Sequence, residues 1–166
     1  MATRIYWLRD PAPGRLAVVA RPRTAASFGQ LKAAGIDVLV SLLEADEAAE
    51  VGLADAAEHC ERAGIEFISM AVMDHGIPQS FEDMHAIVDY LARRRRDGLG
   101  VGAHCFAGLG RSPLLVAAIL ICEGLSADEA IARVSDARGV AVPEMKHQHE
   151  WLQRYAAQLA EAREGR

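Results

Sequence analysis

The sequence is poor in cysteine and in long apolar runs. Its 166 residues include three cysteines, an odd number without close spacing, which argues against a disulfide framework and predicts a reduced, cytoplasmic protein. The longest apolar run, from Leu114 to Cys122, falls well short of the roughly 20 residues that span a bilayer. The first residues also lack the apolar stretch of a secretory signal. We therefore expect no membrane partner.

Positive charge is in short supply as well. Lysine and arginine number 18 against 23 aspartates and glutamates, a net charge of −5 that argues against a nucleic-acid partner. No Cys-x-x-Cys or His-x-x-x-His spacing indicates zinc, and we expect neither a metal nor a cofactor. The hydrophobic share of 51% and charged share of 25% are those of an ordinary globular protein. Without repeats or linkers, residues 1–166 are predicted to form a single domain, of unspecified oligomeric state.

Strand and helix patterns alternate along most of the chain. We expect strands near residues 5–8, 16–20, 36–43 and 65–70, and one more just before Cys105. We expect helices at residues 25–34, about 53–63, 80–96, 114–123 and 126–138, and a last helix that begins within 143–148 and ends at about 162. This alternation predicts an α/β domain with a central, mostly parallel sheet of four to five strands and helices on both faces. Ligands bind such sheets beyond the carboxyl ends of the strands. The loops after Leu43, Met70 and Cys105 should therefore share one rim.

One loop carries the strongest chemical signal. An apolar run ends in His104 and Cys105, five residues follow, and Arg111, Ser112 and Pro113 open the next apolar run. Backbone N–H groups wrapped at a helix N-terminus bind anions, and the same field stabilises a cysteine thiolate. An arginine fork can hold two phosphate oxygens at once. The pattern predicts a phosphate-binding loop that carries its own nucleophile.

The segment His104-Cys105-x5-Arg111-Ser112 resembles the signature of the cysteine-dependent protein tyrosine phosphatase superfamily, most closely its small dual-specificity branch. The resemblance places the catalytic loop at 104–112. It also extends to residues 72–78, where Asp74 to Pro78 looks like the general-acid loop of that family, although Val72 and Met73 replace its usual proline-containing approach. The segment from Arg138 to Gln148 is similar to the family's water-positioning segment.

The resemblance implies a role for each matched residue. Cys105 attacks phosphorus to form a phosphocysteine, and Asp74 protonates the leaving oxygen and then activates water. Ser112 supports the sulfur as a leaving group, His104 braces the loop, and Gln148 helps to position water. The phosphate would be held by the backbone amides of Phe106, Ala107, Gly108, Leu109, Gly110 and Arg111, together with the Arg111 guanidinium.

The expected function is therefore a protein phosphatase that hydrolyses phosphomonoesters. Its predicted partner is a phosphorylated protein or peptide, bearing phosphotyrosine, with phosphoserine and phosphothreonine as further candidates. The variable loop positions carry no lysine or arginine, which disfavours a polyanionic phosphoinositide. An arsenate reductase-like enzyme and a phosphoprotein-binding module are the alternatives that would use the same oxyanion loop. A nucleotide-binding loop is disfavoured because the required lysine is missing.

Several of these residues have simpler interpretations. Asp74 is also a common type of turn residue, and Gln148 lies between two histidines that are compatible with a solvated helix face. Cys60 and Cys122 fall on apolar helix faces and are predicted to be core residues. The Arg93–Arg96 run is interpreted as cations favoured by the dipole at a helix C-terminus.

Overall fold

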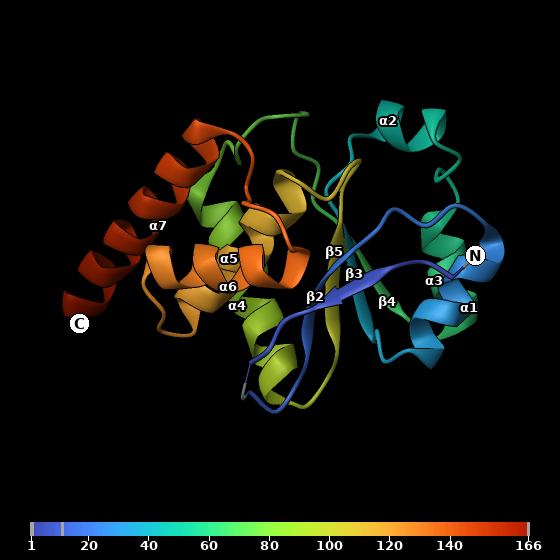
Figure 1. The fold of residues 1–166 in the computed structure, drawn as a ribbon, viewed down its shortest axis with the longest axis horizontal. Coiled ribbons are helices and arrows are strands. Elements are labelled where there is room, and N and C mark those ends of the chain that lie inside the picture. The colour runs from blue at the N-terminus through green and yellow to red at the C-terminus, as the bar shows by residue number, and fades with distance from the viewer. Residues whose placement is uncertain (1, 11, 166) are drawn as a thin grey trace.

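The computed structural model describes residues 2–10 and 12–165, so residues 1, 11 and 166 of the predicted domain lie outside the described part. Its sheet has the strand order β1-β2-β5-β3-β4 (Figure 1). Strand β1 pairs antiparallel with β2, and all other neighbours are parallel. The strands are β1 (Ile5–Trp7), β2 (Leu16–Val19), β3 (Val38–Ser41), β4 (Glu66–Ser69) and β5 (Val101–His104). The predicted α/β fold with a mostly parallel sheet is confirmed.

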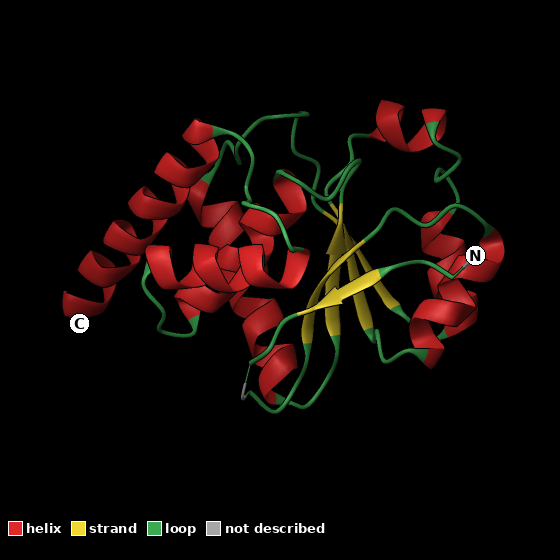
Figure 2. Cartoon of the chain, viewed as in Figure 1, coloured by secondary structure: helices red, strands yellow, loops and turns green. Residues whose placement is uncertain are grey.

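Helices cover both faces of the sheet, as Figure 2 shows. They are α1 (Ala25–Ala33), α2 (Ala45–Glu50), α3 (Ala56–Ala63), α4 (Phe81–Arg96), α5 (Arg111–Cys122), α6 (Ala127–Arg138) and α7 (Lys146–Glu164). Helices α1 and α3 pack on one face, and α4 to α7 lie on the other, so the sheet separates two hydrophobic clusters. Among the described residues, no helix has the length and apolar character needed to cross a membrane.

Local signals account for most helix boundaries. The Ser80 hydroxyl accepts a hydrogen bond from the Asp83 backbone N–H at 3.1 Å, and the Ser126–Glu129 capping box begins α6. Helix α5 begins at Arg111, three residues before the predicted start at 114, because Pro113 fits the first helical turn without needing a donor. The short helix α2 was not predicted as a separate element.

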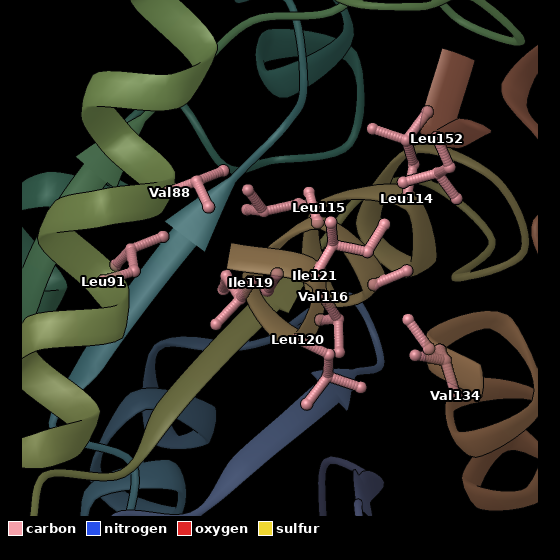
Figure 3. Packing of buried hydrophobic residues seen from close by; sticks show 14 of the residues in the cluster. Val88, Leu91, Leu114, Leu115, Val116, Ile119, Leu120, Ile121, Val134 and Leu152 are labelled. Atoms are coloured by element: carbon pink, nitrogen blue, oxygen red, sulfur yellow. The ribbon is translucent and has the colours of Figure 1, made fainter. Parts of the chain in front are cut away.

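Helix α5 forms the centre of the larger cluster. All of its residues from Arg111 to Ile121 are buried, and Figure 3 shows its leucines, isoleucines and valine packed against Val88 and Leu91 of α4, Val134 of α6 and Leu152 of α7. Strand β5, which precedes the predicted catalytic loop, is also buried throughout. The loop is therefore held between two buried elements, which fixes the position of its backbone.

The arginine run at the end of α4 includes one residue that the dipole interpretation does not explain. Arg95 is fully buried, donates to the Gly14 carbonyl at 3.2 Å and pairs with Asp10 at 2.9 Å and with Glu123. A buried charge requires such partners. Arg95 therefore ties α4 to the N-terminal segment and to the end of α5.

Candidate active site

Loops that follow three neighbouring parallel strands meet at the carboxyl edge of the sheet. Cys105 follows β5, Asp74 lies in the loop after β4, and Glu47 lies in α2, just after β3. Glu47 and Asp74 both contact Arg111, the first residue of α5. The expected rim is thus present, and the predicted catalytic and general-acid loops lie together on it.

The predicted catalytic loop is braced from inside and outside. The Cys105 sulfur is 3.1 Å from the Ser112 hydroxyl, and both residues are buried. Gly108 has a φ of 72°, in the left-handed region that favours glycine. Its carbonyl accepts a hydrogen bond from Arg138 Nε at 2.9 Å, and the Arg138 guanidinium stacks on the Tyr6 ring. Arg138 therefore supports the loop from α6.

Arg111 is held by a carboxylate that the sequence analysis did not assign to the site. Its Nη1 and Nη2 donate to the two carboxylate oxygens of Glu47 at 2.7 and 2.9 Å, and Nη1 also donates to the Val72 carbonyl at 2.8 Å. The Arg111 guanidinium lowers the pKa of Glu47 below its usual value. The available signal was the acidic stretch that begins at Glu44, directly after a buried strand and on the predicted rim.

Asp74 lies over this guanidinium from the solvent side. Its Oδ1 accepts from Arg111 Nη2 at 3.1 Å, and 53% of its side chain is exposed. The adjacent His75 has a φ of 61°, an uncommon backbone conformation for a residue other than glycine, and its Nδ1 is 3.6 Å from Asp74 Oδ2. The turn aims Asp74 at the same pocket as Cys105.

His104 lies beneath the loop rather than within the pocket. It is fully buried, and its Nδ1 donates to the Cys105 carbonyl at 3.3 Å. Burial lowers the pKa of His104 to about 4, so the imidazole is neutral at pH 7. A neutral, buried ring bound to the loop backbone is compatible with the bracing role that the resemblance implies.

Gln148 is fully buried, so the solvated-face interpretation is wrong for this residue. Its Nε2 donates to the Gly76 carbonyl at 3.0 Å, and its Oε1 accepts from the Met145 N–H at 3.2 Å. A Cβ atom on Gly110 would lie only 3.0 Å from Gln148 Nε2. Gln148 is therefore packed between the predicted catalytic loop and the predicted general-acid loop.

These residues surround a pocket of about 240 Å³. Its walls are formed by Asp74, His75, Cys105, Phe106, Ala107, Leu109, Gly110, Arg111 and Glu144. Phe106 is about half exposed at the mouth, with the Arg21 guanidinium 4.3 Å above its ring. Within the described residues, no group of three or more His, Cys, Asp or Glu side chains is arranged to hold a metal ion.

A buried cysteine beside a helix N-terminus, an arginine fork and a facing aspartate define a cysteine-based phosphatase on an α/β fold. Comparison with known families agrees: residues 21–157 match the model of the dual specificity phosphatase catalytic domain. The chain belongs to this family. It is an enzyme of the cysteine-dependent protein phosphatase class, and the arsenate reductase-like and binding-module alternatives are not favoured.

Solved structures show the same fold. Tk-PTP in its active form is 31% identical, with a TM-score of 0.74 over 87% of this chain and 92% of that one. Kinase associated phosphatase with its catalytic cysteine replaced by serine is 22% identical, with a TM-score of 0.87 over 96% and 97% of the two chains. PTPMT1 in complex with PI(5)P is 20% identical, with a TM-score of 0.77 over 94% and 98%.

Proposed function

We propose that this pocket hydrolyses phosphomonoesters of proteins through a phosphocysteine intermediate. The observation that carries the proposal is the convergence of Cys105, Arg111 and Asp74 on one small pocket at a helix N-terminus. The chemistry requires a nucleophile, a cradle for the phosphoryl oxygens and an acid for the leaving group, and these residues supply all three.

In the first step, the Cys105 thiolate attacks phosphorus and the bond from phosphorus to the substrate oxygen breaks. The backbone amides of residues 106–111 and the Arg111 guanidinium bind the phosphoryl oxygens. Among the described residues, no acceptor is paired with Arg111 Nε, while Asp74 takes a single contact on Nη2. Phosphate can therefore bind the Nε and Nη2 edge without displacing Glu47. Asp74 then gives its proton to the leaving oxygen.

In the second step, Asp74 takes a proton from water, which attacks phosphorus and breaks the P–S bond. Phosphate leaves, and Cys105 returns as a thiolate. The Ser112 hydroxyl, 3.1 Å from the sulfur, is placed to donate a hydrogen bond to it and stabilise the developing negative charge. This position supports a role for Ser112 in the second step more than in the first.

The substrate that we propose is a phosphorylated protein or peptide. A pocket of about 240 Å³ with Phe106 at its mouth supports phosphotyrosine, whose ring can pack against the Phe106 side chain. Phosphopeptides that differ only in phosphotyrosine, phosphoserine or phosphothreonine will give the order of preference. A loss of kcat/KM for the phosphotyrosine peptide in Phe106→Ala, without a matching loss for phosphoserine, is the expected result.

The central experiment measures metal-free hydrolysis of an aryl phosphate. Cys105→Ser should abolish activity, while Cys122→Ser, at a cysteine far from the pocket, should not change it. Asp74→Ala should lower the rate by about 10²–10⁴-fold with a poor leaving group, and Asp89→Ala on the surface of α4 should have no effect. Full activity in Cys105→Ser, or none in the wild type, contradicts the proposal.

We also propose a cytoplasmic location, with no nucleic-acid or membrane partner. The three cysteines are free, as the reduced state requires, and the net charge is negative. Fractionation of the cells that express the protein tests the location, and thiol labelling before lysis tests the reduced state of the cysteines. Recovery in a membrane fraction or a disulfide at Cys105 would contradict them.

A further inference from the structure

Helix α7 makes two adjacent contacts with the predicted general-acid loop. Gln148 Nε2 donates to the Gly76 carbonyl at 3.0 Å, and His147 Nε2 donates to the His75 carbonyl. Two neighbouring side chains of one helical turn therefore bind two neighbouring carbonyls of one tight turn. We call these contacts the α7 clamp.

The turn that they hold is unusual and needs support. The Gly76 N–H donates to the Met73 carbonyl at 2.7 Å, and between these residues His75 adopts its positive φ of 61°. Such a conformation persists where surrounding contacts impose it. Asp74 lies in the same turn and is half exposed, so its position depends on the backbone of the turn more than on burial of its own side chain.

Gln148 is itself fixed at three points. Its Oε1 accepts from the Met145 N–H, its Nε2 donates to Gly76, and its side chain lies against the backbone of Gly110. It is fully buried, unlike Gln153 on the same helix, which is exposed and pairs with Asp128. Gln148 thus joins the general-acid loop to the catalytic loop through one rigid carboxamide.

We propose that Gln148, assisted by His147, is a positioning residue that holds Asp74 over the catalytic loop for proton transfer to the leaving group. The inference rests on the proposed function, in which Asp74 is the general acid. It differs from the water-positioning role implied by the family resemblance, because the hydrogen bonds of the Gln148 carboxamide go to the backbone of Gly76 and Met145. Gln148 acts on the first chemical step through the backbone of the acid loop.

Steady-state kinetics with aryl phosphates of different leaving-group pKa separate the two roles. The constant kcat/KM reports only steps up to formation of the phosphocysteine, so a water-positioning residue leaves it unchanged. The key variant is Gln148→Met, which keeps a long side chain against Gly110 but removes the donor to Gly76. His147→Ala removes the second contact, and Gln153→Ala is the matched control.

For Gln148→Met we expect kcat/KM to fall about 10–100-fold with phenyl phosphate, the loss of a positioned acid. With 2,4-dinitrophenyl phosphate, whose leaving group needs no proton, kcat/KM should fall less than threefold. His147→Ala should lower kcat/KM less, again with phenyl phosphate more than with 2,4-dinitrophenyl phosphate. Gln153→Ala should leave kcat/KM unchanged with both substrates. An unchanged kcat/KM with a lower kcat and a burst of phenol assigns Gln148 to water and overturns the inference. An equal loss with both substrates also overturns it.

Hydrogen exchange separates failure of this inference from failure of the proposed function. Gln148→Met should speed amide exchange in residues 72–78 relative to wild type and Gln153→Ala, while exchange in β5 stays the same. If the wild type hydrolyses no aryl phosphate, the proposed function fails and exchange still tests the clamp. If residues 72–78 exchange at the wild-type rate in Gln148→Met, the clamp does not hold the loop.

Discussion

Glu47 holds the Arg111 guanidinium with both carboxylate oxygens, at 2.7 and 2.9 Å. This paired geometry fixes the plane of the guanidinium fork and leaves its Nε edge turned away from Glu47. Asp74 contacts the same guanidinium through one oxygen only, at 3.1 Å. Two acids therefore share one arginine, one as a fixed support and the other as an exchangeable contact.

Removing the charge of Glu47 tests this division. Glu47→Gln should lower kcat/KM about 10–100-fold, because one of the two oxygens that accept from Arg111 becomes an amide donor, and a hydrogen bond to a charged group contributes about 1.5–3 kcal/mol. Because the Arg111 guanidinium lowers the pKa of Glu47, the ion pair stabilises the folded state above the unfolded-state pKa of 4.5 and is lost as pH falls through the lower folded-state pKa. Chemical unfolding at pH 3–7 measures this effect, and Glu50→Gln on the same helix is the control. Equal kinetics for the two variants would show that Arg111 needs no fixed carboxylate.

Much of the fold follows from local sequence signals. The structure contains the strands β3 and β5 that the apolar runs predict. It also has helices that begin after the capping serines at 80 and 126 and helices that end at the glycines at 64 and 139. The order of strands and helices then brings the predicted catalytic and acid loops to one edge, because parallel strands end on the same side. The placement of Cys105 and Asp74 at one edge was predictable for this reason.

The remaining features depend on contacts between distant residues. Glu47 of α2 contacts Arg111 of α5, and no spacing pattern encodes a pair 64 residues apart. Gln148 looks solvated in the sequence because histidines flank it, yet helix packing turns its side chain inward. Arg95 is buried because its partners come from the N-terminal segment and from the end of α5. Tertiary packing decides each of these cases.

The contact between Ser112 and Cys105 predicts which chemical step Ser112 serves. Ser112→Ala should slow hydrolysis of the phosphocysteine about 10-fold or more, since a hydrogen bond to the charged sulfur is lost. The leaving-group release should remain fast, which gives a burst of the alcohol product and a covalent phosphoryl adduct on Cys105. Rapid quench and intact-protein mass spectrometry detect both, and Ser126→Ala, at a remote helix cap, should show neither. If Ser112→Ala shows no burst and its kcat/KM falls as much as its kcat, Ser112 acts in the first step.

Buried His104 predicts a pH-dependent component of stability. Burial lowers its pKa to about 4 in the folded protein, against 6.5 in the unfolded chain. Between these values the unfolded chain binds a proton that the folded protein does not, so stability falls as pH drops from about 6.5 to about 4. Over this pH range the free energy of unfolding should fall by about 3 kcal/mol because of His104. Urea unfolding of wild type and His104→Asn should show that the difference between their free energies of unfolding shrinks as pH falls. A constant difference for His104→Asn would contradict a neutral buried ring.

Arg95 provides a stability test that is independent of the active site. Removing Arg95 leaves Glu123 without its cation and takes one of two arginines from Asp10, so Arg95→Ala should lower the free energy of unfolding by about 3–5 kcal/mol. Arg96→Ala, at the exposed neighbouring position, should change it by no more than about 0.5 kcal/mol. Arg95→Met keeps much of the volume but leaves Glu123 without a cation and Asp10 with Arg133 alone, and it should therefore resemble Arg95→Ala rather than wild type. If Arg95→Met is as stable as wild type, packing of the side chain rather than its charge holds α4 to the N-terminal segment.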